Sequence, residues 1–432
     1  MNDLRPFRGL RFNEAVVGPL GNVVCPPYDV IPKDDQLRLY EKGPYNAVRL
    51  EFGLEYPEDD STNNRYTRAA AFLESWIEKG ALQEEDEPAL YIYEQQFSLN
   101  GKSVVRRGVL SALRLTPWED DVVLPHEETM PKPKADRLQL MRATKCNFSP
   151  LFLLFDDPDG AAVRLMADIC KATPDATVDA GDGQIHRLWV VKGARGNQLA
   201  EALRTPQLYM ADGHHRYETA LAYRDEMRAS NPSDPEDAAY NFALMLLVEA
   251  HDPGLVVLPT HRLVQGVDEQ RLTNLVGELS SRFQVEKVPV DASSPAKVAD
   301  TLLRKMAEGG RESPTLGLYR AGEALTLKLK GSIPRAGARP LLDVDVLHEG
   351  LMEPFLGIGL AELKAGGSVA YTRDAAEAVA LVDRGEAQLS LFLNPTKVEQ
   401  VLETARAHGK MPQKSTYFYP KAITGLVFHS LK

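Results

Sequence analysis

Cysteine is scarce in this chain of 432 residues. Cys25, Cys146 and Cys170 are odd in number and far apart, so they fit neither a disulfide framework nor a zinc site. No histidine occurs in a His-Glu-x-x-His segment, which excludes that zinc signature. The sequence also lacks a Gly-x-x-x-x-Gly-Lys-Ser/Thr loop and a Gly-x-Ser-x-Gly elbow, which excludes a P-loop and the nucleophile of an α/β-hydrolase.

Long apolar runs and an excess of basic residues are missing too. No stretch approaches the roughly 18 apolar residues of a membrane-spanning helix, and the start lacks the apolar core of a signal peptide. Lysine and arginine number 50 against 61 acidic residues, giving a net charge of −11. Such a charge disfavours binding to nucleic acid or to an anionic membrane. We therefore expect a cytoplasmic enzyme or binding protein, without nucleic-acid or membrane partners.

What is present indicates a mixed α/β protein. Length suggests two or three domains, and 44% apolar with 26% charged residues is typical of a globular chain. We expect an N-terminal α/β extension at 1–120, a phosphate-binding domain at 121–265 and a C-terminal α/β domain at 266–432. Periodicity predicts helices at 65–79, 269–283, 296–307, 344–354, 374–383 and 396–408, and strands at 89–97, 104–115, 188–191, 207–211, 315–319, 324–330 and 387–393. The segment 151–155 is an apolar run, the apolar segments 242–248 and 254–258 are expected to be buried, and Thr396 with Glu399 predicts a capping box.

The segment Ala-Asp-Gly-His-His-Arg at 211–216 is the most informative part of the chain. A short strand is predicted to end at Asp212, and helical spacing begins at Tyr217. Asp212 can cap this helix, and Gly213 lets the backbone approach a ligand closely. The pattern therefore predicts a strand, a tight turn and a helix start.

The chemistry of this segment suits an anion. N–H groups at a helix start favour phosphate, and Arg216 adds a planar fork that matches phosphate oxygens. His214 and His215 add donors that titrate near neutrality. The alternative is a capped helix with polar surface residues, but the five residues from 212 to 216 together favour a ligand site.

A second group of polar residues follows the apolar run at 122–125. His126, Glu127 and Glu128 stand at the start of a loop, where a carboxylate can accept a proton or bind a cation. A surface segment without a role is the alternative. A basic stretch follows, which is either a solvated face or a phosphate-binding surface; its members are Lys132, Lys134, Arg137, Arg142 and Lys145.

Two weaker patterns complete the set. Lys414, Ser415 and Thr416 combine a cation with two hydroxyls, which can bind phosphate or carboxylate, although a simple strand start is the default. Asp29, in the sequence Pro-Pro-Tyr-Asp, is interpreted as a turn residue.

These residues carry two resemblances. End to end, the chain resembles a widespread prokaryotic family known only as a domain of unknown function, in the segments 6–11, 26–31, 125–138, 211–220 and 414–421. The segment 212–220 also resembles the Gly-Gly-Cys-His-Arg-Tyr-Glu-Ala segment of sulfiredoxins, in the ParB/sulfiredoxin superfamily. His214 stands where their catalytic cysteine would be, so their thiol chemistry is ruled out.

Within that superfamily the chain is most similar to the free-serine kinases. They share Asp-Gly-His-His-Arg, here at 212–216, and an upstream Pro-His-Glu, here at 125–127. Their C-terminal pattern of Gly-Glu, strand, Pro-Thr-Lys, helix and Lys-Thr-Thr corresponds to residues 385–386, 389–393, 395–397 and 414–416. The two upstream motifs lie farther apart here, and about 120 residues before Pro125 have no counterpart.

The resemblance implies phosphoryl transfer to the hydroxyl of free L-serine, with Mg²⁺ and with ATP, ADP or pyrophosphate as donor. It assigns catalysis to Glu127 as the base, with His126 beside it, and to Asp212, which would orient the hydroxyl or help hold Mg²⁺. The donor phosphates would bind at Gly213, His214, His215 and Arg216, assisted by Lys132, Lys134 and Arg137. Lys414, Ser415 and Thr416 would bind the substrate.

Two other functions stay open at this point. A non-catalytic nucleotide switch of the ParB kind is one, although neither a helix-turn-helix nor a basic tail is evident. The other is a kinase for a different small hydroxyl compound.

Overall fold

The computed structural model describes residues 2–127, 131–291, 294–310, 313–320, 322–333, 339–412 and 414–432, apart from the side chains of residues 131–133 and 364. This part of the chain divides into two compact units. Unit 1 comprises residues 1–125, 129–256 and 420–432, and unit 2 comprises residues 126–128 and 257–419. Both units contain helices and strands, so the predicted mixed α/β class is confirmed.

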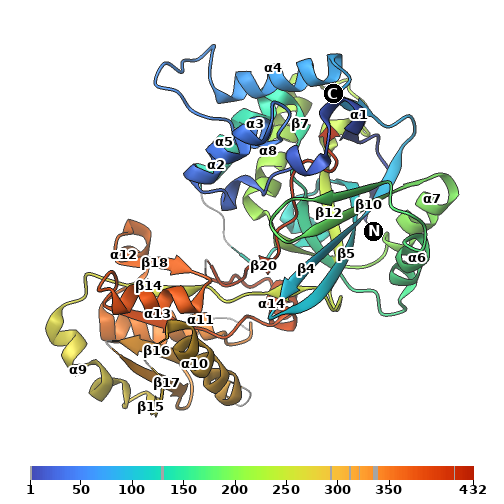
Figure 1. Ribbon diagram of the computed structural model, residues 1–432. Helices are drawn as coiled ribbons and strands as arrows, with labels where there is room; N and C mark the ends of the chain where they lie inside the picture. Colours follow the sequence, from blue (N-terminus) through green and yellow to red (C-terminus); the bar gives the residue numbers. More distant parts are fainter. Residues whose placement is uncertain are drawn as a thin grey trace. The chain divides into compact units, whose positions relative to one another are not determined.

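A large sheet organises unit 1 (Figure 1). Among the described residues the sheet has nine strands: eight follow the order β6-β11-β8-β12-β5-β4-β10-β9, and the ninth, β1, pairs with β5. The strands are β1 (Leu4–Arg5), β4 (Ala89–Leu99), β5 (Lys102–Arg114), β6 (Val123–Leu124), β8 (Leu151–Phe155), β9 (Ala176–Asp179), β10 (Ile185–Lys192), β11 (Leu208–Asp212) and β12 (Phe242–Glu249).

The units differ from the predicted ranges 1–120, 121–265 and 266–432 because strands from both sides of residue 120 share this sheet. β12 pairs with β5 on one side and with β8 on the other. Residues before position 120 are therefore part of the same hydrophobic core as the segment around Asp212, and not a separate extension.

The hairpin β4–β5 turns at Asn100 and Gly101. Their φ angles are 49° and 73°, both in the left-handed region that a two-residue hairpin turn requires. The sequence Asn-Gly supplies residues that tolerate this conformation, so local chemistry alone fixes the hairpin.

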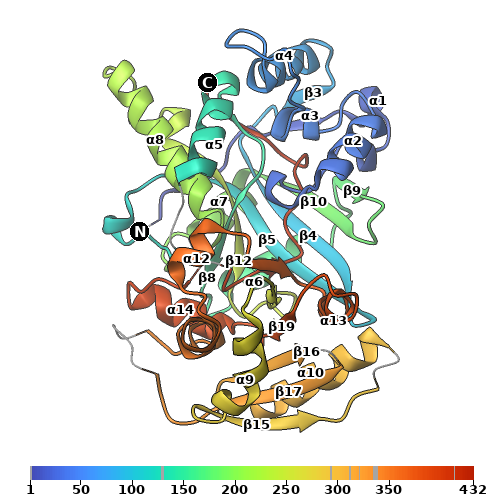
Figure 2. The ribbon, with the colours of Figure 1, turned by 90° about the vertical axis from the view of Figure 1, so that its left-hand side faces the viewer.

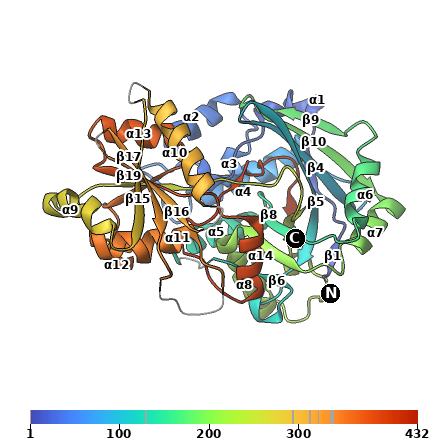
Figure 3. The same cartoon turned by 90° about the horizontal axis from the view of Figure 1, so that it is seen from below.

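Helices cover one face of the sheet. Alternate residues of β8 and β12 (Leu151, Leu153, Met245 and Leu247 among them) point into one apolar cluster with residues of α6, α7 and α8. α6 and α7 lie side by side, and α7 contacts β10 and β4 (Figure 1, Figure 3). The helices of unit 1 are α1 (Glu14–Val17), α2 (Lys33–Lys42), α3 (Val48–Glu51), α4 (Arg65–Glu78), α5 (Pro131–Thr144), α6 (Ala161–Ile169), α7 (Gly193–Ala202) and α8 (His214–Ser230).

The last segment of the chain, residues 420–432, packs on the opposite face. Gln95 Nε2 donates to Lys421 O over 3.0 Å, and Ile423 N donates to Tyr93 Oη over 3.4 Å. Short pairs add to this face: β2 (Leu10–Phe12) with β3 (Leu82–Glu84), and β7 (Cys146–Asn147) with β21 (His429–Ser430). Residues 420–432 are thus built into unit 1, although the residues before them in sequence belong to unit 2.

Unit 2 contains an antiparallel sheet in the order β15-β17-β16-β19-β14-β18, with β15, β17 and β16 side by side in Figure 2. α10 and α13 pack on one face, around Val298, Leu302 and Val379. Its strands are β14 (His261–Val264), β15 (Phe283–Val288), β16 (Thr315–Arg320), β17 (Glu323–Leu329), β18 (Val369–Thr372) and β19 (Leu389–Phe392), and short strands β13 (Val256–Val257) and β20 (Phe418–Tyr419) lie near its ends in sequence. Its helices are α9 (Glu269–Leu279), α10 (Pro295–Gly309), α11 (Asp343–Asp345), the π-helix Val346–Leu356, α12 (Leu360–Ala365), α13 (Ala375–Asp383) and α14 (Val398–Arg406).

Three local predictions were wrong. The helix expected at 269–283 ends at Leu279, because Phe283 begins a strand paired with β17. In the apolar segment 254–258, which was expected to be buried, Gly254 is buried but residues 255–258 are only half-buried. The capping box expected at Thr396 and Glu399 is shifted by one residue, with Lys397 N donating to Gln400 Oε1 over 2.9 Å.

In the described part of the chain, no helix combines the length and apolarity that a bilayer crossing demands.

Candidate functional site

The junction of β11 and α8 forms the centre of the candidate site. β11 is buried up to Ala211, ends at Asp212, and α8 begins at His214. Gly213 is the N-cap with φ 98°, and a Cβ there would lie 2.7 Å from Leu151 Cδ2. Only glycine fits this turn without strain. The predicted cap at Asp212 was wrong, because its side chain points to two cations instead.

Those cations are Lys421 and Arg216. Lys421 Nζ donates to Asp212 Oδ1, and Arg216 Nη2 donates to Asp212 Oδ2 over 2.9 Å. Burial by itself would raise the pKa of the Asp212 carboxyl, but the Lys421 ammonium and the Arg216 guanidinium hold it well below its usual range. Asp212 is therefore ionised at any physiological pH.

Arg216 is fixed from its other side by the turn before β8. Its Nη1 donates to Ser149 Oγ over 3.0 Å and to Pro150 O over 2.8 Å. Within the described residues its Nε and its second Nη2 hydrogen form no further hydrogen bond. A guanidinium oriented in this way retains donors for an incoming anion.

A buried group of residues supports Arg216 from behind. Ser149 Oγ donates to Glu51 Oε1 over 3.0 Å, and Arg137 Nη1 lies 3.6 Å from the same oxygen. The Arg137 guanidinium stacks 4.0 Å above the ring of Tyr28. Burial raises the pKa of Tyr28 to about 12 against the opposing effect of Arg216 and Arg137. A cavity of about 50 Å³ lies among Glu51, Arg137, Ser149 and Arg216, which is room for a few waters.

The other predicted phosphate ligands have partners of their own. Lys134 pairs with Glu218 of α8. Arg137 pairs with Asp136 of its own helix over 2.6 Å, and its Nη1 donates to Glu51 O of α3 over 2.8 Å. The side chain of Lys132 lies outside the described residues. The basic stretch thus ties α5 to its neighbours, at least at positions 134 and 137.

The two histidines of the motif differ in exposure. His214 is 5% exposed, and its ring lies 6.4 Å from that of Trp118. His215 is half-buried, and its carbonyl accepts from Thr219 Oγ1 over 2.7 Å. A ligand at this helix start would meet the backbone of His214 and the side chain of His215 more readily than the ring of His214.

Unit 2 brings together the other predicted residues. His126 is fully buried, and its Nε2 lies 3.2 Å from Thr416 Oγ1. Met411 N donates to His126 O over 2.7 Å, and Glu127 forms a parallel bridge with Met411. Segments about 290 residues apart, His126–Glu127 and Lys414–Thr416, are thus neighbours. Glu128 lies outside the described residues.

Backbone contacts hold the segment 414–416. Thr396 Oγ1 donates to Ser415 O over 2.7 Å, and Arg262 Nη2 donates to Lys414 O over 3.4 Å. Ser415 Oγ donates to Pro412 O, while the Lys414 side chain is exposed. The predicted substrate residues therefore sit on a fixed turn with a solvent-accessible lysine.

Sequence reasoning missed Lys421, Glu51 and Tyr28 as parts of the site around Asp212. Lys421 is 209 residues from its partner, and Glu51 lies in a segment without a recognised motif. Glu51 and Asp212 come close to arginine side chains only in the folded chain, so local sequence patterns do not reveal these contacts. The only available signal was membership of Tyr28 and Lys421 in the segments that carry the family resemblance.

The similarity to solved structures is low. A free serine kinase mutant in complex with AMP is 13% identical, with a TM-score of 0.37, and covers 72% of this chain and 86% of its own. A conserved hypothetical protein from Pyrococcus furiosus is 14% identical, with a TM-score of 0.34, and covers 74% of this chain and 95% of its own. SbnI from Staphylococcus aureus, truncated at its C-terminus, is 10% identical, with a TM-score of 0.35, and covers 74% and 86%.

No curated protein sequence matches the chain. A family match covers most of it: residues 4–346, which include the segments around Tyr28, Glu51, Glu127 and Asp212, match the family described as "Protein of unknown function (DUF1015)". The chain belongs to the DUF1015 family.

Proposed function

We propose that this protein transfers a phosphoryl group from a nucleotide or pyrophosphate to the hydroxyl of free L-serine, giving O-phosphoserine. The observation that carries the proposal is the Asp-Gly-His-His-Arg motif at a strand-to-helix junction, with Arg216 and Lys421 held on either side of Asp212. Glu127 and the residues of the segment 414–416 enter through the sequence resemblance.

The start of α8 suits the donor phosphates. No side chain caps this helix, which has 17 residues and a Gly213 N-cap. The first N–H groups of α8 and its helix dipole favour an anion. The remaining N–H donors of Arg216 favour an anion as well. Gly213, His214, His215 and Arg216 are thus proposed to bind phosphate, with Lys132, Lys134 and Arg137 as secondary contributors.

Strand topology supports Glu127 as the base. β6 pairs in parallel with β11, with Leu124 opposite Tyr209. Glu127 follows Leu124 by three residues, as Asp212 follows Tyr209. Neighbouring parallel strands end at one edge of a sheet, so β6 and β11 end at the same edge of the unit 1 sheet. Ligands of α/β proteins commonly bind beyond the carboxyl ends of parallel strands.

The proposed step is an in-line displacement. Glu127 accepts the proton of the serine hydroxyl, the hydroxyl oxygen bonds to the terminal phosphorus, and the bond to the leaving phosphate oxygen breaks. The positive charge of Arg216 and Lys421 stabilises the charge on the transferring group. His126 holds the segment that carries Glu127, and Lys414, Ser415 and Thr416 are proposed to bind serine.

Magnesium is proposed to arrive with the donor. Both carboxylate oxygens of Asp212 already accept from cationic side chains, so the residue fits a metal poorly in this arrangement. Bound to the donor phosphates, Mg²⁺ would neutralise part of their charge.

The test is direct. The full chain is incubated with L-serine, Mg²⁺ and ATP, ADP or pyrophosphate in turn, and products are followed by phosphorus NMR. We expect O-phosphoserine with at least one donor. Glu127→Gln should reduce the rate by about 10²–10⁴, the usual effect of losing a positioned base. Glu399→Gln, an exposed glutamate on α14, is the matched control and should keep the wild-type rate.

Three outcomes would contradict the proposal in different ways. Nucleotide binding without any turnover would favour the ParB-like switch. Turnover with glycerol or another alcohol, but not with serine, would place the protein among kinases for a different acceptor. Full activity of Glu127→Gln would remove this residue from the mechanism.

A further inference from the structure

A second cluster of ligand-type side chains lies at another edge of the unit 1 sheet. β8 and β12 are parallel neighbours, with Phe155 opposite Glu249. Asp156 follows β8 directly, Glu249 is the last residue of β12, and His251 comes two residues later. Ala250 N donates to Phe155 O over 2.9 Å, so backbone pairing continues up to these residues and fixes their spacing.

The three side chains converge. One ligand atom from each of Asp156, Glu249 and His251 lies within 4.8 Å of the others. His251 Nε2 is 3.6 Å from Asp156 Oδ1. Two ligands of one zinc ion, each about 2.1 Å from the metal at a tetrahedral angle, are roughly 3.4 Å apart. The separation of His251 Nε2 and Asp156 Oδ1 is close to this value.

The burial of Glu249 points to a cation. Its residue is 8% exposed, and its Oε2 accepts from His251 N over 2.7 Å. In the part of the chain that the structure describes, no lysine or arginine pairs with Glu249. Buried carboxylates are ordinarily paired with a cation or coordinate a metal.

The carboxylates of the two neighbouring acids, Asp157 and Asp252, accept hydrogen bonds from other backbone groups. Asp157 accepts from Ala161 N and Val163 N, over 3.0 and 2.9 Å, at the start of α6. Asp252 accepts from Gly254 N over 2.7 Å. These two carboxylates make the edge more negative, while Asp156 and Glu249 face His251.

We propose that Asp156, Glu249 and His251 bind a divalent transition-metal ion, with Zn²⁺ as the best fit. One imidazole nitrogen and two carboxylate oxygens are donors that zinc accepts, whereas Mg²⁺ prefers oxygen alone and keeps its waters. Water completes the coordination. The bound ion links the exits of β8 and β12 and stabilises unit 1.

This site is separate from the one around Asp212. β11 runs antiparallel to β8, with Asp212 opposite Phe152. Asp156 lies four residues farther along β8, a distance of about 13 Å at the rise of a strand. The inference therefore does not depend on the proposed kinase activity, and its test uses no nucleotide.

The experiment is calorimetric titration of ZnCl₂ into the chelator-treated full chain. We expect one strong site per chain, at least a tenfold loss of affinity in both Glu249→Gln and His251→Ala, and no change in His408→Ala, which removes an exposed histidine of unit 2. Co²⁺ provides a spectroscopic check, because its visible bands depend on the ligand set and should change in His251→Ala.

Zinc should also raise the melting temperature of the wild type and of His408→Ala, but not of His251→Ala. His251 is exposed, so its variant is expected to fold even if Glu249→Gln does not. Absence of zinc binding by the wild type would overturn the proposal. Equal affinity in the wild type and His251→Ala, or an equal loss in His408→Ala, would also overturn it.

Discussion

At the scale of single residues, Asp212 shows how the tertiary structure changes the role of a side chain. Its position before a helix suits a cap, yet its two oxygens accept from Lys421 and Arg216. An ion pair in which the acid is shared by two cations keeps each of them oriented. Arg216 is thereby held in one orientation, which would reduce the entropy lost on binding the anion proposed for this site.

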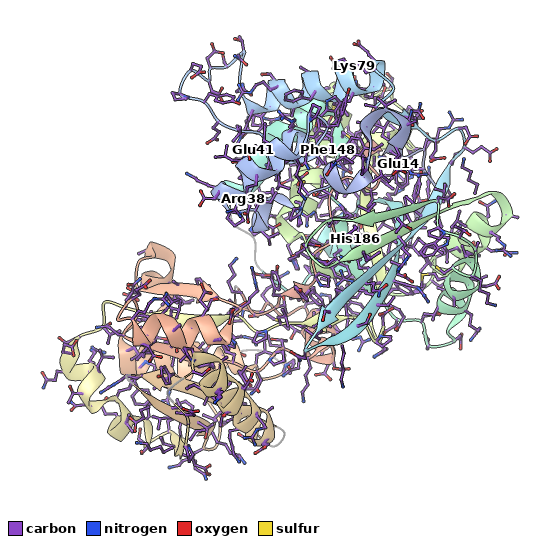
Figure 4. The ribbon with its side chains drawn as sticks, viewed as in Figure 1. Glu14, Arg38, Glu41, Lys79, Phe148 and His186 are labelled. Carbon is purple, nitrogen blue, oxygen red and sulfur yellow. The ribbon has the colours of Figure 1, made fainter. Side chains whose placement is uncertain are left out.

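Lys421→Met tests this arrangement. Removing one cation leaves the partly buried Asp212 with Arg216 alone, so the pKa of Asp212 should rise and the free energy of unfolding should fall by about 1–3 kcal/mol. Urea denaturation measures the second effect. Lys79→Met, on the exposed Lys79 labelled in Figure 4, is the matched control in unit 1. Equal stability of the two variants would show that the ion pair contributes nothing.

At the scale of elements, the segment 420–432 contributes buried side chains to the interior of unit 1. Phe428 is fully buried and makes edge contacts with Phe12 and Phe148, at ring distances of 5.7 and 5.3 Å. Phe148 is labelled in Figure 4 and precedes Ser149, which orients Arg216. Packing of this last segment thus supports both the hydrophobic core and the turn behind the candidate site.

Phe428→Ala should therefore lower the free energy of unfolding by about 3–5 kcal/mol, because it leaves a cavity among aromatic rings. Phe428→Leu, which fills more of the space, should cost less than half as much. Guanidinium denaturation followed by tryptophan fluorescence measures both. Similar small decreases in the free energy of unfolding for the two variants would mean that residues 420–432 pack loosely.

At the scale of the whole molecule, both units bury histidines in their neutral form. Burial lowers the pKa of His186 and His429 in unit 1, and of His261 and His348 in unit 2, to about 4. In the unfolded chain a histidine titrates near 6.5. Between these values the unfolded state binds more protons than the folded state, so stability is complete above about pH 6.5 and declines as the pH falls toward 4.

The expected result is a loss of about 1–2 kcal/mol per histidine at pH 5 relative to pH 7. Urea denaturation across this range measures the slope. His186, labelled in Figure 4, accepts from or donates to Tyr93 Oη over 2.8 Å, and His186→Gln keeps a polar partner there without a titrating group. This variant should reduce the pH dependence of stability by the contribution of one of the four histidines. A wild-type stability that is constant from pH 7 to pH 5 would contradict the prediction.

Local sequence patterns were sufficient to predict the structural features that depend on residues adjacent in the chain. Asn100-Gly101 predicts its hairpin because both residues tolerate a left-handed backbone. The strand-to-helix junction at 208–214 follows from an apolar run, a glycine and helical spacing. The resemblance of the segments at 125–127 and 212–216 directed attention to a phosphate site, again from short motifs.

Only the tertiary structure decided which distant residues meet. Lys421 reaches Asp212, Glu51 supports Arg216 through Ser149, and Arg137 is buried by an aspartate and a tyrosine instead of facing solvent. The helix expected to end at Phe283 stops earlier because a partner strand pairs with that residue. The physical reason is the same in each case: a charge or a strand edge is satisfied by whichever group the folded chain brings near it, and sequence distance carries no information about that group.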